Sequence, residues 1–311
     1  MTKQILLDCQ KRIAPFVHNT SVLTSQAINE LLSANVFFKC ENFQKMGAFK
    51  MRGALNAIMQ LSETQKAKGV VTHSSGNFAQ AVSLAAKNLG VKAYIVMPSS
   101  APKVKQEAVL GYGGIITICE PSLKAREETS DKIKKETGAT FIHPSNDLDV
   151  IVGNSTACTE LLNFQNDLDV VITPVGGGGL LSGSILATKY FSPNTKVIGA
   201  EPLGADDAFR SIRDNTIYPS VNPQTIADGL LTSLSNRTFN IIKDGVDRII
   251  TVKEDSIKKA MYLIWERMKI IIEPSSATVL AVIMENKELF KHKNIAMILS
   301  GGNISAILKS K

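Results

Sequence analysis

Lys50 lies in the stretch ENFQKMGAFKMRG, with Phe49 and Met51 beside it and Met46 and Ala48 close in sequence. Apolar surroundings disfavour the charged ammonium form and so lower the pKa of a lysine. The neutral amine that results can form a Schiff base with a carbonyl group. The pattern favours covalent chemistry at Lys50, although an ordinary lysine beside apolar residues remains the alternative.

Four consecutive glycines, residues 176–179, follow an apolar run that ends at Val175 and precede an amphipathic segment that starts near Leu180. So many glycines are costly in conformational entropy unless the backbone must approach something closely. Backbone N–H groups in such a loop and at the start of a helix suit a phosphate. Leu181 replaces the third glycine of a dinucleotide motif and Ser184 replaces the P-loop lysine, so a small monophosphate fits better. A tight strand-to-helix turn is the alternative.

Two further polar turns follow apolar runs, Ser74-Ser75-Gly76-Asn77 and Ser300-Gly301-Gly302-Asn303. The first combines hydroxyl, amide and N–H groups that could bind a carboxylate or cap a helix. Both turns would lie at the carboxyl ends of strands, where open α/β sheets bind their ligands.

The rest of the pattern predicts the scaffold for these residues. Short β-branched runs alternate with amphipathic segments, which is typical of a parallel sheet covered by helices. The expected strands are 70–72, 93–97, 115–119, 140–142, 170–173, 196–200 and 295–299. The expected helices are 77–89, 102–110, 123–137, 180–190, 256–268 and a last one that ends at 283. No low-complexity linker divides the chain, so we expect one domain to be inserted in the other.

Composition narrows the possible functions. The chain has 311 residues with 44% hydrophobic and 20% charged residues, as in a soluble globular protein with room for two domains. Its net charge of +7 is spread out, and the most basic run, 124–135, also contains acidic residues, so we expect no nucleic-acid binding. Charged residues interrupt the apolar patch near the N-terminus, so we expect no secretion signal, no membrane span and a cytoplasmic enzyme. The scattered cysteines and histidines predict no transition-metal centre.

Several motifs resemble, in their order along the chain, those of the fold-type II pyridoxal-phosphate enzymes, specifically the serine racemase and serine/threonine dehydratase group. They are KMGAFKMRGA, SSGNFAQA, PVGGGGLLSG, GAEP with ADD, IADG, IIEPSSA and LSGGN. The resemblance covers almost the whole chain. It implies an α/β fold with two open, mostly parallel sheets and helices on both faces. It also implies that a small domain, residues 63–146, is inserted in a large domain that binds pyridoxal 5'-phosphate (PLP), residues 1–62 and 147–311.

The resemblance also implies the cofactor contacts. Lys50 would hold PLP as a Schiff base, Phe49 would pack beside the pyridine ring, and Asn77 would hydrogen-bond its 3-hydroxyl. Ser300 would face the ring nitrogen. Because a neutral hydroxyl does not keep that nitrogen protonated, the resulting weaker electron sink favours rapid loss of a β-substituent. The remaining expected cofactor contacts are Gly176, Gly177, Gly178, Gly179, Gly229 and Glu273.

The same comparison suggests how the substrate is bound. Ser74, Ser75 and Asn77 would hold its carboxylate. Arg126 matches a family arginine that can approach the substrate from the small domain, or it is an exposed helix residue. Ser75 stands where the family's racemases have the serine that returns a proton on the cofactor face opposite the lysine. A hydroxyaspartate dehydratase carries the same serine, so Ser75 permits racemisation without requiring it.

A divalent cation is the second expected ligand. Glu201, Ala205 and Asp207 match a cation site of the serine racemase-like branch. Two carboxylates and a carbonyl are suitable ligands for Mg²⁺ or a similar ion. A polar loop after a strand is the alternative.

Three positions depart from the family pattern. Ala48 replaces a serine or threonine, Phe78 replaces the histidine that usually follows Ser-Gly-Asn, and Gly153-Asn154-Ser155-Thr156 replaces Gly-Gln-Gly-Thr. Phe78 has no hydrogen-bonding group, so a substrate contact normally made there would be lost or supplied elsewhere.

We therefore expect a PLP-dependent L-serine/L-threonine dehydratase that releases pyruvate or 2-oxobutanoate plus ammonia. The alternatives are a serine racemase with side elimination activity and a 3-hydroxyaspartate dehydratase. A catalytically silent protein that binds PLP or an amino acid is a non-enzymatic alternative. The expected partners are a small hydroxy amino acid and a second copy of the chain in a homodimer. Because the chain ends soon after Ser300, we do not expect feedback inhibition by isoleucine.

Overall fold

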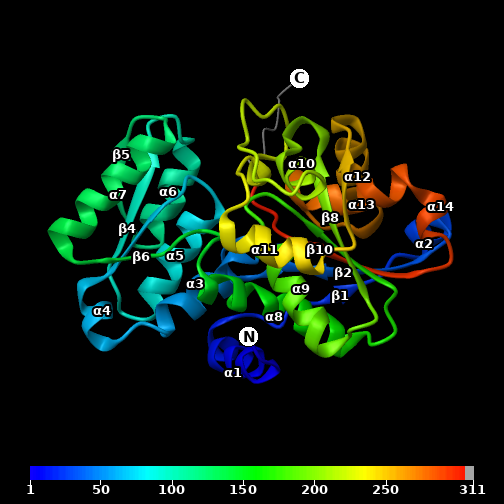
Figure 1. The fold of residues 1–311 in the computed structure, drawn as a ribbon, viewed down its shortest axis with the longest axis horizontal. Coiled ribbons are helices and arrows are strands. Elements are labelled where there is room, and N and C mark those ends of the chain that lie inside the picture. The colour runs from blue at the N-terminus through cyan, green and yellow to red at the C-terminus, as the bar shows by residue number, and fades with distance from the viewer. Residues whose placement is uncertain (305–311) are drawn as a thin grey trace.

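Two β-sheets organise the chain in the computed structural model, which describes residues 1–304 (Figure 1). The larger sheet has the order β1-β2-β10-β7-β8-β9, and β1 is antiparallel to β2 while the other neighbours are parallel. Its strands are β1 (Val22–Leu23), β2 (Asn35–Cys40), β7 (Val170–Pro174), β8 (Lys196–Pro202), β9 (Arg248–Val252) and β10 (Asn294–Leu299). The smaller sheet, β5-β4-β3-β6, is parallel throughout. Its strands are β3 (Val70–His73), β4 (Ala93–Pro98), β5 (Ile115–Cys119) and β6 (Thr140–Phe141).

Helices cover these sheets as the parallel pattern requires. Those around the smaller sheet are α4 (Glu63–Lys68), α5 (Asn77–Asn88), α6 (Lys103–Gly111) and α7 (Leu123–Thr137). The remaining helices are α1 (Lys3–Ile13), α2 (Gln26–Leu32), α3 (Lys50–Met59), α8 (Leu148–Phe164), α9 (Gly179–Phe191), α10 (Asp207–Arg213), α11 (Asn236–Gly245), α12 (Glu254–Met268), α13 (Pro274–Glu285) and α14 (Lys287–Phe290). Short 3-10 turns are η1 (Ala14–Phe16), η2 (Glu41–Phe43), η3 (Lys45–Gly47), η4 (Leu203–Ala205) and η5 (Asp228–Leu230). Of the helices described, none is both long and apolar enough to cross a membrane.

Alternation along the strands explains why the small sheet is apolar on both faces. Val70 packs in the same cluster as helix α5, whereas its neighbour Val71 packs with Ile133 of α7 on the opposite face. Because both faces are covered by helices, these strands read as continuous apolar runs. All four strands lie between β2 and β7 in sequence, so the small lobe is an insertion in the large one.

The predicted α/β architecture with two mostly parallel sheets is confirmed, and each expected strand and helix is present with shifts of a residue or two at its ends. The domain bounds 1–62 with 147–311 and 63–146 stay a prediction. The elements that were not predicted are strands β1, β2 and β9 and helices α1, α2, α3, α4, α8, α10, α11 and α14. Helix α8 is buried around most of its circumference, so it lacks the one-sided periodicity that marks a surface helix.

Glycines let three helices cross at backbone contact and so bring the chemical residues together. A Cβ on Gly153 of α8 would lie 2.5 Å from the Arg52 carbonyl oxygen of α3. A Cβ on Gly183 of α9 would lie 2.7 Å from the Ser155 backbone nitrogen of α8. Helix α8 therefore holds α3, which starts at Lys50, against α9, which starts in the glycine loop.

A buried ionic network fixes the first turn of α3. Arg52, fully buried, donates from Nε to Glu41 Oε2 at 2.7 Å and from Nη1 to Glu160 Oε1 at 2.7 Å. Lys39 donates to Glu160 Oε2 at 2.6 Å. Burial alone would raise the pKa of Glu41, but the Arg52 guanidinium outweighs it and the pKa is lowered. Each buried charge has a partner, so the network anchors Arg52, two residues after Lys50, without leaving an unpaired buried ion.

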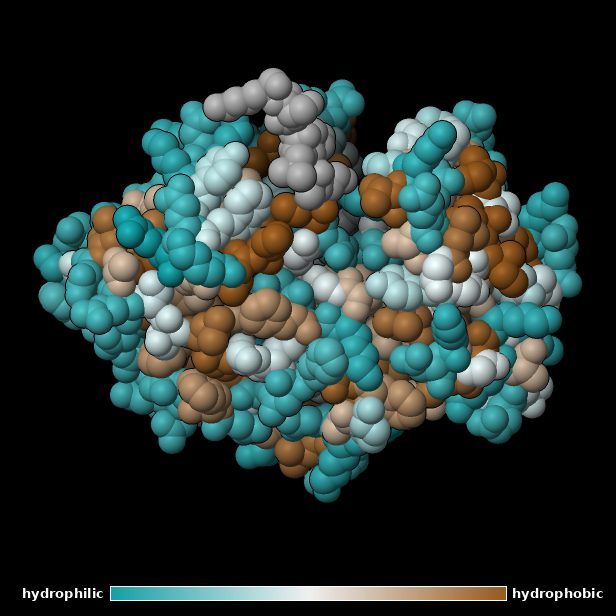
Figure 2. Space-filling model, turned by 180° about the vertical axis from the view of Figure 1, so that it is seen from behind, coloured by the Kyte–Doolittle hydropathy of each residue, from teal (hydrophilic) through white to brown (hydrophobic). Residues whose placement is uncertain are grey.

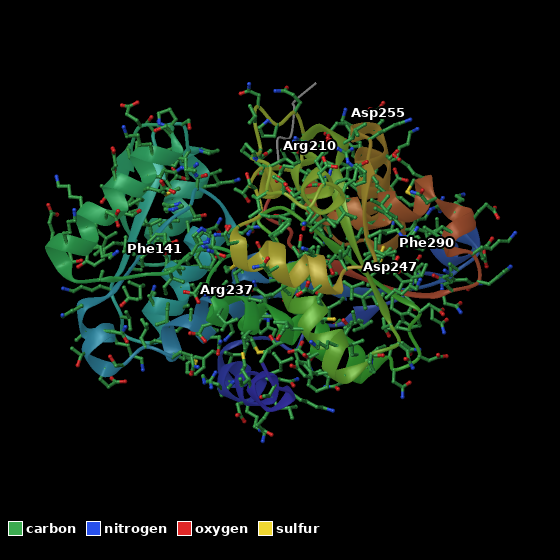
Figure 3. All side chains as sticks on the ribbon, viewed as in Figure 1. Phe141, Arg210, Arg237, Asp247, Asp255 and Phe290 are labelled. Carbon is green, nitrogen blue, oxygen red and sulfur yellow. The ribbon has the colours of Figure 1, made fainter. Side chains whose placement is uncertain are left out.

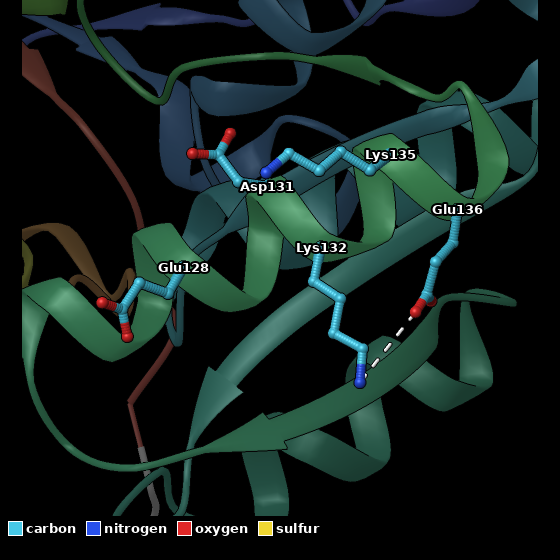
Figure 4. A pocket seen from close by; sticks show the side chains of 5 residues that line it. All are labelled: Glu128, Asp131, Lys132, Lys135 and Glu136. Carbon is cyan, nitrogen blue, oxygen red and sulfur yellow. Dashed lines mark ion pairs between the residues drawn. The ribbon is translucent and has the colours of Figure 1, made fainter.

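The surface carries hydrophilic residues with scattered apolar patches, as the rear view shows (Figure 2). The basic run predicted to be a solvated helix face forms the outer side of α7. A shallow pocket there is lined by Glu128, Asp131, Lys132, Lys135 and Glu136 (Figure 4). Lys132 lies 3.9 Å from Glu136, and both side chains are exposed. This alternation of charges does not form a uniformly basic strip.

Candidate active site

Lys50 is partly buried at the first position of α3 and contacts both lobes. Its Nζ donates to the Pro144 carbonyl at 3.0 Å and lies 5.0 Å from the ring centre of Phe49 and 5.5 Å from that of Phe78. Desolvation lowers the pKa of Lys50 to about 8, and the charge of Glu273 opposes this fall. Roughly a tenth of the amine is thus neutral and nucleophilic at pH 7, far more than for an ordinary lysine, as the apolar neighbours predict.

Asn77, at the start of α5, joins the two sheets. Its Nδ2 donates to the carboxylate of Glu273, 3.0 Å from Oε1 and 3.1 Å from Oε2. The Asn303 amide donates to Asn77 Oδ1 at 2.9 Å, and the Asn303 backbone donates to Glu273 Oε2 at 3.2 Å. Burial raises the pKa of Glu273 to about 7, against the effect of the Asn77 hydrogen bond. The network holds the Asn77 amide in a fixed orientation at the carboxyl edges of both sheets.

The glycine loop is crowded on two sides. A Cβ on Gly176 would lie 2.9 Å from the Cα of Leu230, and one on Gly177 would lie 2.6 Å from the Ser145 hydroxyl oxygen. Gly178 has a φ of +80°, which L side chains rarely adopt. A tight turn alone would not bring a separate loop against Gly176 and a separate serine against Gly177.

An unsatisfied amide marks the same place. Asn154 of α8 is fully buried, and neither its amide nitrogen nor its amide oxygen has a partner among the described residues. Its Nδ2 lies 3.4 Å from where a Cβ on Gly179 would stand. A buried amide without a partner is costly, and a phosphate oxygen in the loop would accept its hydrogen bond. The loop, the start of α9 and this amide therefore fit the phosphate of PLP.

Ser300 and Gly229 are held in place by hydrogen bonds within the large lobe. The Ser300 carbonyl accepts from the Phe49 backbone at 3.0 Å, and its buried hydroxyl lies 3.1 Å from that of Ser276. The Gly229 N–H donates to the Ser275 hydroxyl at 3.0 Å. The end of β10 is thus tied directly to the residue before Lys50.

The predicted substrate residues are less fully connected to Lys50. The Ser74 hydroxyl accepts from the Gly76 backbone at 3.3 Å, and Ser75 lies partly buried in the same turn. Arg126, in the first turn of α7, donates to the Ser122 carbonyl at 3.4 Å. Its charge acts on His73, whose pKa is lowered by burial and then by Arg126. Among the described residues, no hydrogen bond or ion pair joins Ser75 or Arg126 to Lys50.

The predicted cation site contains two buried carboxylates. Glu201 accepts from the backbone of Ala208 at 2.8 Å and of Phe209 at 2.7 Å, and burial raises its pKa to about 9. Both oxygens of Asp207 are buried without a well-formed hydrogen bond among the described residues, and burial raises its pKa. Ala205 ends the adjoining turn η4. Among the described residues, no group of three or more His, Cys, Asp or Glu side chains could hold a metal. The expected ligands of the cation are therefore only two carboxylates, Glu201 and Asp207, and one backbone carbonyl, that of Ala205. A divalent cation would pair with the Asp207 oxygens, which lack a partner among the described residues.

Sequence reasoning missed several residues of the site. Pro144 and Ser145 contact Lys50 and the glycine loop, and His143 precedes them. They follow the predicted strand 140–142 at its carboxyl end, where α/β sheets bind ligands, so their position in the sequence could have indicated a role in the site. Asn154 appeared only as a departure from the family pattern, and Asn303 only as part of a polar turn.

A desolvated lysine and a glycine loop meet at the carboxyl edges of two mostly parallel sheets. This arrangement defines the class: an α/β enzyme that holds a phosphorylated carbonyl cofactor. The family described as pyridoxal-phosphate dependent enzyme matches residues 13–301, and the chain belongs to that family. It is 50% identical to a serine racemase of Dictyostelium discoideum, over 100% of this chain and 97% of that one. It is 47% identical to a beta-hydroxyaspartate dehydratase of Paracoccus denitrificans, over 97% and 96%. The crystal structure of the T.th. threonine deaminase superposes with a TM-score of 0.93 at 41% identity, over 98% and 99%.

These findings confirm the predicted family, the fold-type II architecture, PLP as cofactor and a PLP-dependent enzyme. The relatives named above are a racemase, a dehydratase and a deaminase, as expected for this family.

Proposed function

We propose that the protein catalyses PLP-dependent dehydration of L-serine or L-threonine, releasing pyruvate or 2-oxobutanoate plus ammonia. The observation that carries this proposal is the Lys50 amine, whose lowered pKa suits a group that first binds a carbonyl and then accepts a proton. When bound, PLP withdraws electrons from the α-carbon of an amino acid and acidifies its proton.

Each predicted residue would have a separate role in the reaction. Lys50 would hold the cofactor and, once displaced by the substrate, remove the Cα proton. Ser74, Ser75 and Asn77 would hold the substrate carboxylate, with Arg126 approaching from α7. Gly176, Gly177, Gly178 and Gly179, with Asn154 and Ser145 beside them, would bind the phosphate.

The remaining predicted cofactor contacts belong to the large lobe. Ser300 would face the nitrogen of the PLP ring, Phe49 would pack beside the ring, and Gly229 and Glu273 would support it from the large lobe. The Ser300 hydroxyl is paired with the Ser276 hydroxyl, so a neutral group is available there. This neutrality supports elimination over a long-lived carbanion.

Racemisation of serine is the second candidate function. Ser75 and the 50% identity to a serine racemase favour it. Dehydration of 3-hydroxyaspartate is supported by the 47% identity to a beta-hydroxyaspartate dehydratase. Phe78 is buried beside Lys50 and provides no charged group for a third substrate substituent, which supports a smaller substrate.

We further propose that Glu201, Asp207 and the Ala205 carbonyl bind Mg²⁺ or a similar ion. The cytoplasm as the location and a homodimer as the assembly stay predictions.

The test uses purified protein loaded with PLP. We expect a yellow protein whose visible absorbance is lost in Lys50→Ala. Incubation with L-serine, L-threonine and 3-hydroxyaspartate, followed by keto-acid and chiral amino-acid assays, identifies the reaction. A colourless protein that does not bind PLP would refute the proposal, and D-serine without keto acid would make racemisation the main activity.

A further inference from the structure

One side chain folds the segment between β6 and α8 into a tight turn. His143 Nδ1 accepts two backbone hydrogen bonds, from Ser145 at 3.1 Å and from Asn146 at 2.8 Å. A ring nitrogen that accepts carries no proton, so the proton of the neutral imidazole lies on Nε2. The strand end before the turn is also anchored, because the Thr72 hydroxyl donates to the Ile142 carbonyl at 2.8 Å.

Each of the next three residues touches a different part of the site. The Pro144 carbonyl accepts from Lys50 Nζ at 3.0 Å. The Ser145 hydroxyl oxygen lies 2.6 Å from where a Cβ on Gly177 would stand, so it faces the glycine loop. The Asn146 Oδ1 accepts from the Arg237 backbone at 3.2 Å, at the start of α11 on the border of the two lobes (Figure 3).

We propose that His143 is a positioning residue of the active site, whose Nδ1 holds the turn that presents the Pro144 carbonyl to Lys50 and the Ser145 hydroxyl to the phosphate loop. This inference rests on the proposed roles of Lys50 and the glycine loop. It deepens them, because it explains how a segment of the small lobe reaches both at once. The two hydrogen bonds that His143 Nδ1 accepts hold the backbone that follows Pro144. Pro144 has no N–H group, so it cannot make such a backbone hydrogen bond of its own.

A role for His143 in proton transfer does not fit its surroundings. Burial lowers its pKa to about 4, and the positive charges of His73 and Lys50 contribute to this. The ring is therefore neutral near neutral pH, and its basic nitrogen is already occupied by two N–H groups. The ring therefore acts by holding the backbone of the turn in place.

Two substitutions at this position separate the acceptor from the bulk of the side chain. In His143→Asn, the amide oxygen stands as many bonds from Cβ as Nδ1 does, and asparagine forms the same kind of turn. His143→Leu has a side chain that fills the space but has no acceptor. We expect Leu to weaken PLP binding about tenfold or more, as loss of two hydrogen bonds implies, and Asn to restore it to within about threefold.

The measurements are PLP titration by visible absorbance, the pH midpoint of that absorbance, and the melting temperature of the cofactor-free protein. We expect Leu to shift the pH midpoint, since the Lys50 amine loses its fixed acceptor, and Asn to return it to the wild-type value. A purely structural role would lower the melting temperature and leave both PLP readouts unchanged. PLP binding to the Leu variant as tight as to the wild type, or an Asn variant that behaves like Leu, would overturn the inference.

Two further variants keep the outcome interpretable. Ser145→Ala leaves the turn intact and should weaken PLP binding several-fold, so an unchanged affinity refutes the Ser145 part even if the Leu variant does not fold. Lys50→Ala tests the proposed function itself. Loss of visible absorbance in Lys50→Ala together with wild-type behaviour of His143→Leu would refute this inference alone, whereas retained absorbance in Lys50→Ala would refute the proposed function.

Discussion

Glu201 should make the stability of the cation-free protein depend on pH. Burial raises its pKa from 4.5 to about 9, and Asp207 adds to the rise. The folded protein therefore keeps a proton on Glu201 at pH values where the unfolded chain has lost it. The free energy of unfolding consequently falls as the pH rises from about 4.5 to about 9.

The size of the effect follows from the width of this window. One pKa unit corresponds to about 1.36 kcal/mol, so raising the pH from 6 to 8 removes about 2.7 kcal/mol through Glu201 alone. At roughly 2 °C per kcal/mol for a chain of this length, the melting temperature falls by about 5 °C. A divalent cation binds the ionised carboxylate, so its stabilisation grows with pH and reaches about 2.7 kcal/mol at a hundred times its Kd.

Thermal unfolding at pH 6, 7 and 8, in chelator and in excess Mg²⁺, measures both effects. Glu201→Gln is the control variant, because it keeps the size and removes the ionisable group. Its amide nitrogen cannot accept one of the two backbone hydrogen bonds, a loss that is the same at every pH, so the comparison uses the change with pH. We expect the fall between pH 6 and 8 in chelator to be about 5 °C smaller in the Gln variant, and its response to Mg²⁺ to be lost. Equal falls in the two proteins, or equal stabilisation of both by Mg²⁺, would refute the reasoning.

Three further substitutions test the scaffold and the chemistry. Gly176→Ala forces a Cβ to within 2.9 Å of the Leu230 Cα, so PLP titration should show at least about tenfold weaker binding, and wild-type affinity would contradict the proposed phosphate loop. Glu160→Ala leaves Arg52 and Lys39 without one partner in the interior and should cost about 3–5 kcal/mol in urea unfolding, so an unchanged midpoint would contradict the role of the network. Ser75→Ala should reduce D-serine formation by about 100-fold or more while keto-acid formation persists, and equal loss of both would contradict a racemising serine.

The fold was predictable wherever periodicity was one-sided or turns were explicit. The strand at 295–299 and the charged helix at 123–137, ended by Gly138, were found in this way. Strand β2 was missed because it contains the charged Lys39, which is fully buried only by pairing with Glu160, far away in sequence. Such pairing is a tertiary effect that local pattern does not contain.

The residues of the site also fall into those with a local sequence signal and those without one. Lys50 and the glycine loop carry local signals, because apolar neighbours and consecutive glycines are visible in a short window. The Pro144 carbonyl carries none, since its role depends on the distance to Lys50 across 94 positions of sequence. The pairing of Asn77 with Glu273 spans 196 positions and is equally hidden. What sequence pattern misses is therefore the set of contacts between the lobes.

Those contacts imply that the site exists only while the lobes are held together. Asn77 of the small lobe is paired with Glu273 of the large one, and Lys105 of α6 reaches Asp228 of η5 at 2.5 Å, one residue before Gly229. The charges of Asp228 and Lys105 also act on the pKa of Glu273, in opposite directions. A separation of the lobes would leave the buried Glu273 without its Asn77 donor and would withdraw the turn around Pro144 from Lys50. A cofactor held by the predicted residues of both lobes would therefore stabilise their juxtaposition and would itself bind more tightly when the lobes are together.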